Sequence, residues 1–199
     1  MSIQQQVYQH IQGLPAGQAF SARTLRSFGS ADSIWQALSR LVKHKKLKRV
    51  ARGIYIRPKI TENFGELPLS TQEIITAIAK NTGETIAIHG AEAARQLQLS
   101  TQAPIREIYY TTGYTRHISI GNRTIKLQHV SPSKIVAPGT LAGKAIHALW
   151  YLGKSAVTAG TMKKIKKRIG EAEFNQLNQY VALMPVWMAE AYSKERNTK

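Results

Sequence analysis

The sequence predicts an α+β protein of two domains, and three observations lead to this. Some stretches carry apolar residues every three to four positions, as helices do, while others are short and β-prone. A length of 199 residues allows one or two domains. A break with polar residues, one Gly and one Pro also occurs over residues 59–69. Residues 1–60 hold eleven Lys and Arg but a single acid, Asp32.

The whole chain is strongly basic, with a net charge of +17 and a pI near 10.3. Such a charge favours a polyanionic partner, most simply nucleic acid. A hydrophobic content of 43% is enough for a packed core.

The sequence also excludes several kinds of site and targeting segment. Without cysteine there is no disulfide, thiolate zinc site or cysteine nucleophile, which suits a reducing cytosol, so we expect a cytoplasmic protein. The first residues are polar glutamines rather than a signal peptide. No run of about 18 apolar residues occurs, so we expect no membrane partner.

Two helices are predicted at the start of the chain. Ile3, Val7 and Ile11 repeat at helical spacing and predict a helix over residues 3–12, which Pro15 ends. A second short helix is expected to follow Ser21.

A third helix is predicted over residues 31–45, with Ser30 as its N-cap. Its apolar stripe includes Ile34 and Leu38, and polar residues occupy the opposite face. Trp35 lies about 100° round the helix from Gln36 on the polar face and is expected to pack at the edge of the core.

After this helix the spacing of apolar residues changes from that of a helix to that of strands. It predicts two short strands, over residues 47–50 and 54–57, with a turn at 51–53. Three helices followed by a basic hairpin predict a winged helix-turn-helix domain over residues 1–58. The helix would enter the major groove while the hairpin lies over phosphate. The expected DNA contacts are Ser30, Ser33, Gln36, Arg40, Lys43, Lys48, Arg49, Arg52 and Tyr55. The alternative is a merely solvated helix face, which normally carries charges of both signs.

A linker is predicted over residues 59–70, followed by a second, mixed α/β domain over residues 71–199. Ser70 and Glu73 form a capping box that predicts a helix beginning at Thr71 and ending at Gly83. Strands are predicted over residues 85–89, 107–112, 116–120 and 123–130, with the last two joined by a tight turn at Gly121-Asn122. A helix is predicted over residues 91–99, and everything from Leu141 reads as helical.

Several segments resemble the AbiE-type abortive-infection antitoxins of type IV toxin–antitoxin systems. They are RGIYIRP at the end of the first domain, IHGAEAARQLQLSTQAP, IYYTTGYTRHISIGNRTIKL and the late LMPVW. The resemblance extends over residues 3–187. It implies a DNA-binding domain joined to a C-terminal antitoxin domain, repression of the protein's own operon, and neutralisation of a co-encoded nucleotidyltransferase-like toxin. The helix over 31–45 and the hairpin over 48–55 occupy the positions that touch DNA in such proteins.

The residues give no pattern for an enzyme, a metal site or a cofactor. None of the histidines His10, His44, His89, His117, His129 and His147 is spaced as a helical metal site. His89 and Glu92 stand three apart, which is more simply a histidine at a strand end beside a solvated glutamate. The glycines match neither a phosphate-binding loop nor a dinucleotide fingerprint. We therefore expect a protein that is not an enzyme and needs no cofactor.

A second basic surface is predicted on a late helix. It consists of Lys163, Lys164, Lys166, Lys167 and Arg168. These charges either keep the helix soluble or contact nucleic acid or an acidic partner. The tyrosines Tyr109, Tyr110 and Tyr114 near Arg116 are candidates for stacking on RNA bases, although alternating tyrosines in a strand are more often packing residues.

The expected function is therefore that of a DNA-binding antitoxin and autorepressor. Because one short helix reads few bases, two copies on an inverted-repeat operator are expected. Two alternatives stay open: a winged-helix transcription factor whose C-terminal domain senses a ligand without any toxin, and an RNA-binding protein.

Overall fold

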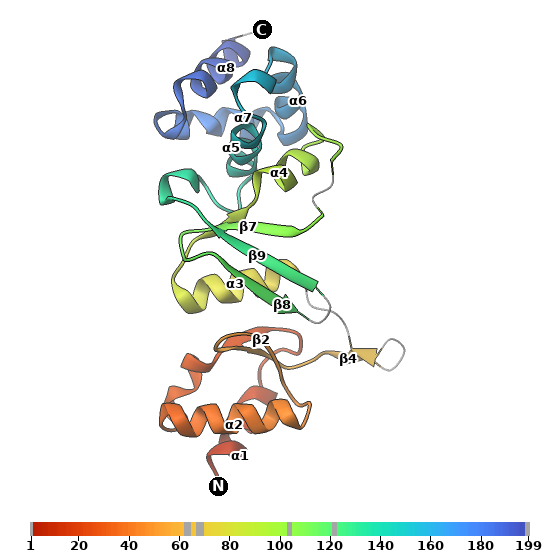
Figure 1. Cartoon of the computed structure of the whole chain (residues 1–199), viewed down its shortest axis with the longest axis vertical. Helices are drawn as coiled ribbons and strands as arrows, with labels where there is room; N and C mark the ends of the chain where they lie inside the picture. Colours follow the sequence, from red (N-terminus) through yellow and green to blue (C-terminus); the bar gives the residue numbers. More distant parts are fainter. Residues whose placement is uncertain (1, 62–64, 67–69, 103–104, 121–122, 198–199) are drawn as a thin grey trace. The chain divides into compact units, whose positions relative to one another are not determined.

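The computed structural model describes residues 2–61, 65–66, 70–102, 105–120 and 123–197. It has a mixed α+β fold, as predicted. The chain divides into two compact units, one of Met1–Glu84 with Ile118–Arg123 and one of Thr85–His117 with Thr124–Lys199. Figure 1 colours the chain from red at the N-terminus to blue at the C-terminus.

The first unit begins with three helical segments around one core. They are α1 (Ile3–Gln12), the 3-10 helix η1 (Ala22–Phe28) and α2 (Ala31–Lys43). The bounds of α1 are those predicted, whereas α2 ends two residues earlier than expected, at Lys43 with His44 as its C-cap. The core that they share consists of Val7, Ile11, Phe20, Leu25, Ile34, Leu38, Leu41, Leu47 and Tyr55.

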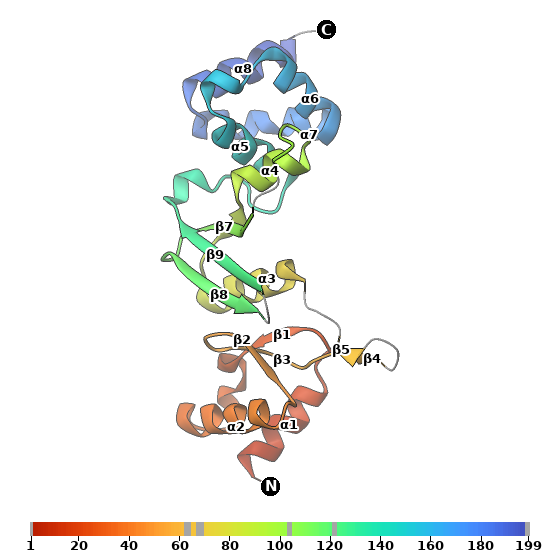
Figure 2. The ribbon, with the colours of Figure 1, turned by 45° about the vertical axis from the view of Figure 1, so that its right-hand side comes forward.

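A three-stranded antiparallel sheet completes this core, with the strand order β1-β3-β2. Its strands are β1 (Ala19–Ser21), β2 (Lys48–Ala51) and β3 (Ile54–Ile56), which lie side by side in Figure 2. Gly53 has φ of +74° in the tight turn between β2 and β3, a conformation that glycine adopts at little cost. The hairpin is therefore present as predicted, while β1 was not expected.

The helix α3 (Thr71–Thr82) packs against β1 and β3. The predicted capping box is confirmed, because Ser70 Oγ accepts from the Glu73 amide at 3.2 Å and the Glu73 carboxylate accepts from the Ser70 amide at 3.1 Å. Gly83 ends the helix in the left-handed conformation.

This packing places the division of the chain after Glu84, not within the expected linker over residues 59–70. Along β3, Tyr55 faces the helical core, so Ile54 and Ile56 point to the other face of the sheet. Both isoleucines are nevertheless buried, because α3 covers that face. The expected linker itself carries two short paired strands, β4 (Ile60–Thr61) and β5 (Gly65–Glu66).

The chain also contains a four-stranded sheet with the order β6-β7-β9-β8. Its strands are β6 (Ile86–Ile88), β7 (Glu107–Thr111), β8 (Arg116–Ile120) and β9 (Arg123–His129). β6 is antiparallel to β7, and β7 is parallel to β9. The predicted turn at Gly121-Asn122 lies outside the described residues.

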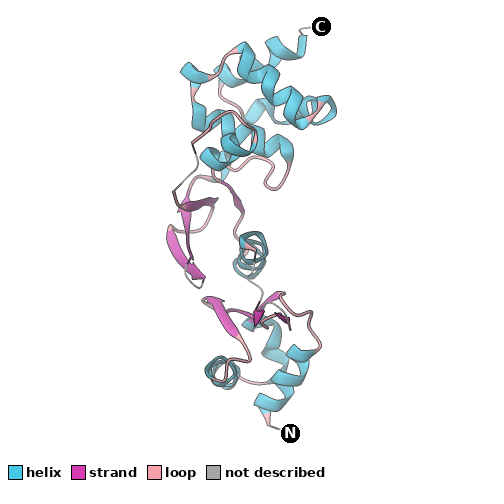
Figure 3. Ribbon diagram, turned by 90° about the vertical axis from the view of Figure 1, so that its right-hand side faces the viewer, coloured by secondary structure: helices cyan, strands magenta, loops and turns pink. Residues whose placement is uncertain are grey.

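Helices make up the rest of the second unit, as Figure 3 shows in cyan. They are α4 (Gly90–Gln96), α5 (Leu141–Leu152), α6 (Ala159–Ile169), α7 (Glu171–Gln176) and α8 (Val186–Asn197), with short 3-10 turns η2 (Pro132–Lys134), η3 (Lys154–Ala156) and η4 (Leu177–Leu183). α4 lies very close to α5, and a Cβ atom on Gly90 would be 2.5 Å from the His147 carbonyl oxygen. Glycine at this position is what allows the close approach.

Within the part of the chain that the structure describes, no helix has both the length and the apolar character needed to cross a membrane.

Candidate nucleic-acid interface

The helix α2 presents a polar face that its own sequence fixes. Ser30 caps the helix by accepting from the Ser33 amide at 3.3 Å, and the two serine hydroxyls lie 2.9 Å apart. The apolar stripe, including Ile34 and Leu38, is buried in the core. The side of α2 that faces away from this core is therefore free to meet another molecule.

The residues expected to read DNA divide into two groups on α2. Gln36, Arg40 and Lys43 are exposed and share one face, because they lie four and three positions apart. Arg40 also reaches α1, where its Nη1 donates to the Gln4 side chain at 3.5 Å. Ser33 is half-buried, and its hydroxyl is already hydrogen-bonded to the hydroxyl of the N-cap residue Ser30.

The hairpin that follows α2 carries three exposed cations. Lys48 and Arg49 lie on β2, and Arg52 lies in the tight turn. In this structure Arg49 folds back, and its Nε donates to the Ala51 carbonyl at 3.4 Å. The hairpin therefore presents positive charge, as an element that lies over phosphate requires.

Tyr55 differs from the other predicted contacts. Its side chain is only 3% exposed and stacks on Phe20, with ring centroids 6.3 Å apart. The reason is that β3 is the central strand and that Tyr55 lies on the face of the sheet that packs against the helical core. Tyr55 is thus a core residue of the first unit and leaves the set of candidate DNA contacts.

Trp35 was expected at the edge of the core, and this prediction is wrong. The indole is 61% exposed, on the side of α2 next to Gln36. Asp32, one turn earlier on the exposed face, was also missed as a candidate. Its carboxylate lies in the first turn, where the helix dipole favours negative charge. Plotting every residue on a helical wheel, not only the apolar ones, would have revealed both.

The second basic surface lies on α6. Lys163, Lys164, Lys167 and Arg168 are exposed on one side, opposite the buried Met162, Ile165 and Ile169. Lys166 is set apart from these four, because its Nζ pairs with Glu171 at 3.1 Å. Arg168 donates to the Gln98 side chain. Four of the five predicted cations thus form one patch.

The predicted tyrosine platform is only partly exposed. Tyr109 and Tyr110 are half-buried in β7. Tyr114 is 71% exposed, and the Arg116 guanidinium lies over its ring at 4.9 Å. A single exposed ring already stacked on a cation gives less support for base stacking than three rings in a row would.

A cluster of aromatic and histidine rings lies where β7, α4 and α5 meet. Tyr110 is 4.7 Å from His89 and 5.9 Å from His147, measured between ring centroids. Burial lowers the pKa of His147 to about 4, an effect that the Lys134 backbone partly offsets and that His89 reinforces. Burial, followed by the charge of Lys126, also lowers the pKa of His89. Both lowered pKa values favour the neutral form of these histidines at physiological pH.

Among the described residues no group of three or more His, Asp or Glu could hold a metal ion. His89 Nδ1 instead accepts from the Ala91 amide at 3.2 Å and caps α4.

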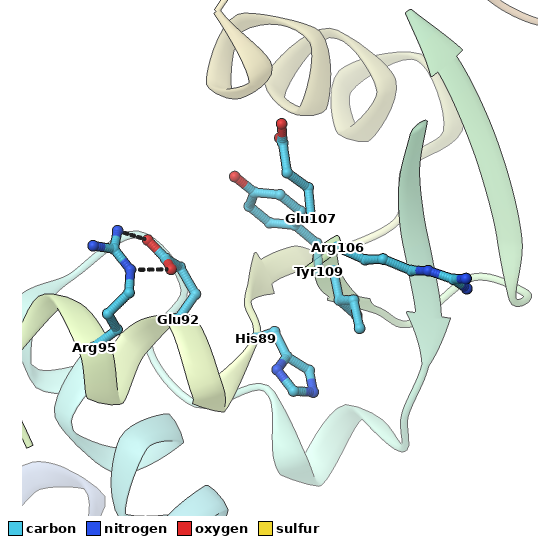
Figure 4. Close-up of a pocket in the computed structure, with 7 residues that line it drawn as sticks. His89, Glu92, Arg95, Arg106, Glu107 and Tyr109 are labelled. Carbon is cyan, nitrogen blue, oxygen red and sulfur yellow. Dashed lines mark hydrogen bonds and ion pairs between the residues drawn. The ribbon is translucent and has the colours of Figure 1, made fainter. Parts of the chain in front are cut away.

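A pocket of about 340 Å³ lies beside this histidine and is drawn in Figure 4. Glu92 and Arg95 form a bidentate ion pair on one side of it, with Nε to Oε2 at 2.7 Å and Nη2 to Oε1 at 2.5 Å. Arg106 and Glu107 point in different directions from the start of β7 (Figure 4). Glu92 and Arg95 satisfy one another, so this pair is not available to a ligand without breaking the ion pair.

Comparison with known proteins identifies a family but no activity. No curated protein and no solved structure matches this chain. The model of a family of unknown function, DUF6088, matches residues 6–177, which span α2, the hairpin and most of the second unit. The family description names no activity, so the resemblance to AbiE-type antitoxins stays a prediction. The chain belongs to the DUF6088 family.

Proposed function

We propose that this protein binds double-stranded DNA through α2 and the β2–β3 hairpin, with the first unit acting as a winged helix-turn-helix. The observation that carries the proposal is the exposed face of α2, where Gln36, Arg40 and Lys43 lie together. The order of helices and strands, α1-β1-η1-α2-β2-β3, suits such a domain. A single acid among eleven cations in residues 1–60 suits a phosphate backbone.

A pair of matched variants tests this interface. Arg40→Ala with Lys43→Ala and Lys163→Ala with Lys164→Ala each remove two positive charges, the first pair from α2 and the second from α6. The full-length variants are titrated with a duplex from upstream of the gene at fixed salt. We expect the α2 pair to lose at least tenfold in affinity, since each phosphate or base contact contributes about 1 kcal/mol or more. An equal loss in both pairs, or a larger loss in the α6 pair, would contradict α2 as the interface.

The second part of the proposal is that the DNA-bound protein represses its own operon and neutralises a co-encoded nucleotidyltransferase-like toxin. It rests on the resemblance of RGIYIRP and the later segments to AbiE-type antitoxins. The product of the neighbouring gene is expressed with and without this protein, and growth is followed. Rescue of growth by the wild-type protein and by the α2 variant supports an antitoxin role separate from repression. Failure of the wild-type protein to rescue contradicts it and leaves the ligand-sensing alternative.

A further inference from the structure

We propose that Trp35 is a base-contacting residue of α2 that recognises thymine through its 5-methyl group. The proposal rests on the proposed DNA-binding function of α2 and adds a specificity determinant to it. It begins from the unexpected exposure of the indole, which is 61%. Trp150 and Trp187, the other tryptophans of the chain, are half-buried.

The position of Trp35 on α2 leaves its ring accessible. Residues three and four positions apart are neighbours on a helix surface. For Trp35 those four positions away are Ala31 and Ser39, which are small, so the ring projects beyond them. Those three positions away are the exposed Asp32 and the buried Leu38. Ile34 and Leu38 are buried and hold α2 on the core, which fixes the side of the helix from which the indole projects.

The neighbours of Trp35 narrow the chemistry of its partner. Gln36 is the next residue and is exposed, and the surrounding unit is strongly basic apart from Asp32, which lies one turn before Trp35. In the major groove the 5-methyl group of thymine is the apolar feature that distinguishes base pairs, and glutamine pairs best with adenine. An apolar ring next to an amide therefore suits a segment rich in A·T pairs.

Replacing thymine by deoxyuridine removes only this methyl group, so it tests the contact directly. The full-length protein is first footprinted on the DNA upstream of its gene, and each thymine of the protected site is then replaced in turn. We expect at least one replacement to weaken wild-type binding about fourfold, as the loss of one buried methyl of ~0.8 kcal/mol predicts. Trp35→Ala should be insensitive to that replacement, and Trp35→Phe should keep part of the sensitivity.

The outcomes separate this inference from the function on which it rests. Because the indole is exposed, Trp35→Ala should unfold at the wild-type temperature, which circular dichroism verifies. Specific binding that no deoxyuridine replacement weakens overturns the thymine contact and leaves DNA binding intact. If Trp35→Ala keeps full affinity for DNA but dissociates an oligomer in light scattering, Trp35 is a protein contact and the inference is wrong. Absence of binding to any duplex overturns the proposed function itself.

Discussion

The Ser21 hydroxyl donates a hydrogen bond to the side-chain oxygen of Asn81, which joins the end of β1 to the last turn of α3. The Asn81 carbonyl also accepts from Arg23 Nη1 at 3.2 Å. These bonds link segments about sixty residues apart within the first unit. They tie α3 to the sheet that carries the hairpin.

A fragment of residues 1–84 should therefore be more stable than one of residues 1–60. The shorter fragment uncovers Ile54 and Ile56, which α3 buries, and each buried isoleucine contributes about 1.5–3 kcal/mol. We expect the free energy of unfolding, measured by urea denaturation, to differ by about 3 kcal/mol or more. Asn81→Ala in the longer fragment is the control and should cost only ~1 kcal/mol. Equal stability of the two fragments would show that α3 is not part of the first unit.

Local sequence patterns were enough to predict the helices and their caps. The spacing of apolar residues and the caps Ser30 and Ser70 located α1, α2 and α3, because these signals are contained within one or two turns. β1 was missed because its three residues become a strand only by pairing with β3, more than thirty residues later.

The candidate interface was predictable only in part, for a similar reason. The exposed Gln36, Arg40 and Lys43 followed from helical spacing alone. The burial of Tyr55 depends on β1 pairing with β3 and on the helical core that packs against this face of the sheet, which no local pattern reveals. Trp35 was misplaced because an angle of about 100° from Gln36 puts a side chain near the border between the exposed and buried faces, where the angle alone does not decide its burial.

Gly90→Ala should destabilise the second unit. The new Cβ atom would lie 2.5 Å from the His147 carbonyl oxygen and 2.6 Å from the Tyr151 Cβ atom, so α4 and α5 would have to separate. We expect a loss of about 1–3 kcal/mol, as overpacked cores show, and a lower melting temperature. The matched control is Gly160→Ala in α6, whose nearest atom would be Thr158 Oγ1 at 3.6 Å. It should be neutral or slightly stabilising, and an equal loss in both variants would refute the steric explanation.

Acid should destabilise the protein through His147. Its side chain is 1% exposed, and burial lowers its pKa to about 4 from 6.5. Between these values the unfolded chain binds a proton that the folded chain does not, so the free energy of unfolding falls as the pH falls. At 1.36 kcal/mol per pKa unit, the loss amounts to about 3 kcal/mol. The lowered pKa of His89 acts in the same direction.

His147→Leu should remove most of this pH dependence. Both ring nitrogens of His147 are buried without a hydrogen-bond partner of good geometry, so an apolar side chain should also be tolerated well. Urea denaturation at several pH values between about pH 7 and about pH 4 measures the effect. A variant that loses stability with acid as steeply as the wild type would show that other groups are responsible.

Removing Arg49 and Arg52 should reduce the salt dependence of DNA binding. Each phosphate contact contributes about 0.9 to the slope of log affinity against log salt, so the double alanine variant should flatten the slope by roughly two at most. Affinity should fall on all duplexes alike, because phosphate contacts carry little sequence information. Arg49 must release the Ala51 carbonyl to reach DNA. We therefore expect Arg49 to contribute less to the salt slope than Arg52. An unchanged slope would exclude the hairpin as a phosphate contact.

Gln36→Ala should reduce specificity more than affinity. Gln36 lies in the N-terminal half of α2, which in helix-turn-helix proteins approaches base edges, and its amide can pair with adenine through two hydrogen bonds. The loss should be about 1–3 kcal/mol on the operator and much less on a random duplex. Lys43→Ala is the comparison, since Lys43 is the last residue of α2 and should weaken both duplexes about equally. Titrations of both variants on both duplexes at one salt concentration decide between these roles.

If Gln36→Ala loses the same factor in affinity on operator and random DNA, α2 does not read bases through this residue. The recognition surface would then have to lie elsewhere on the first unit.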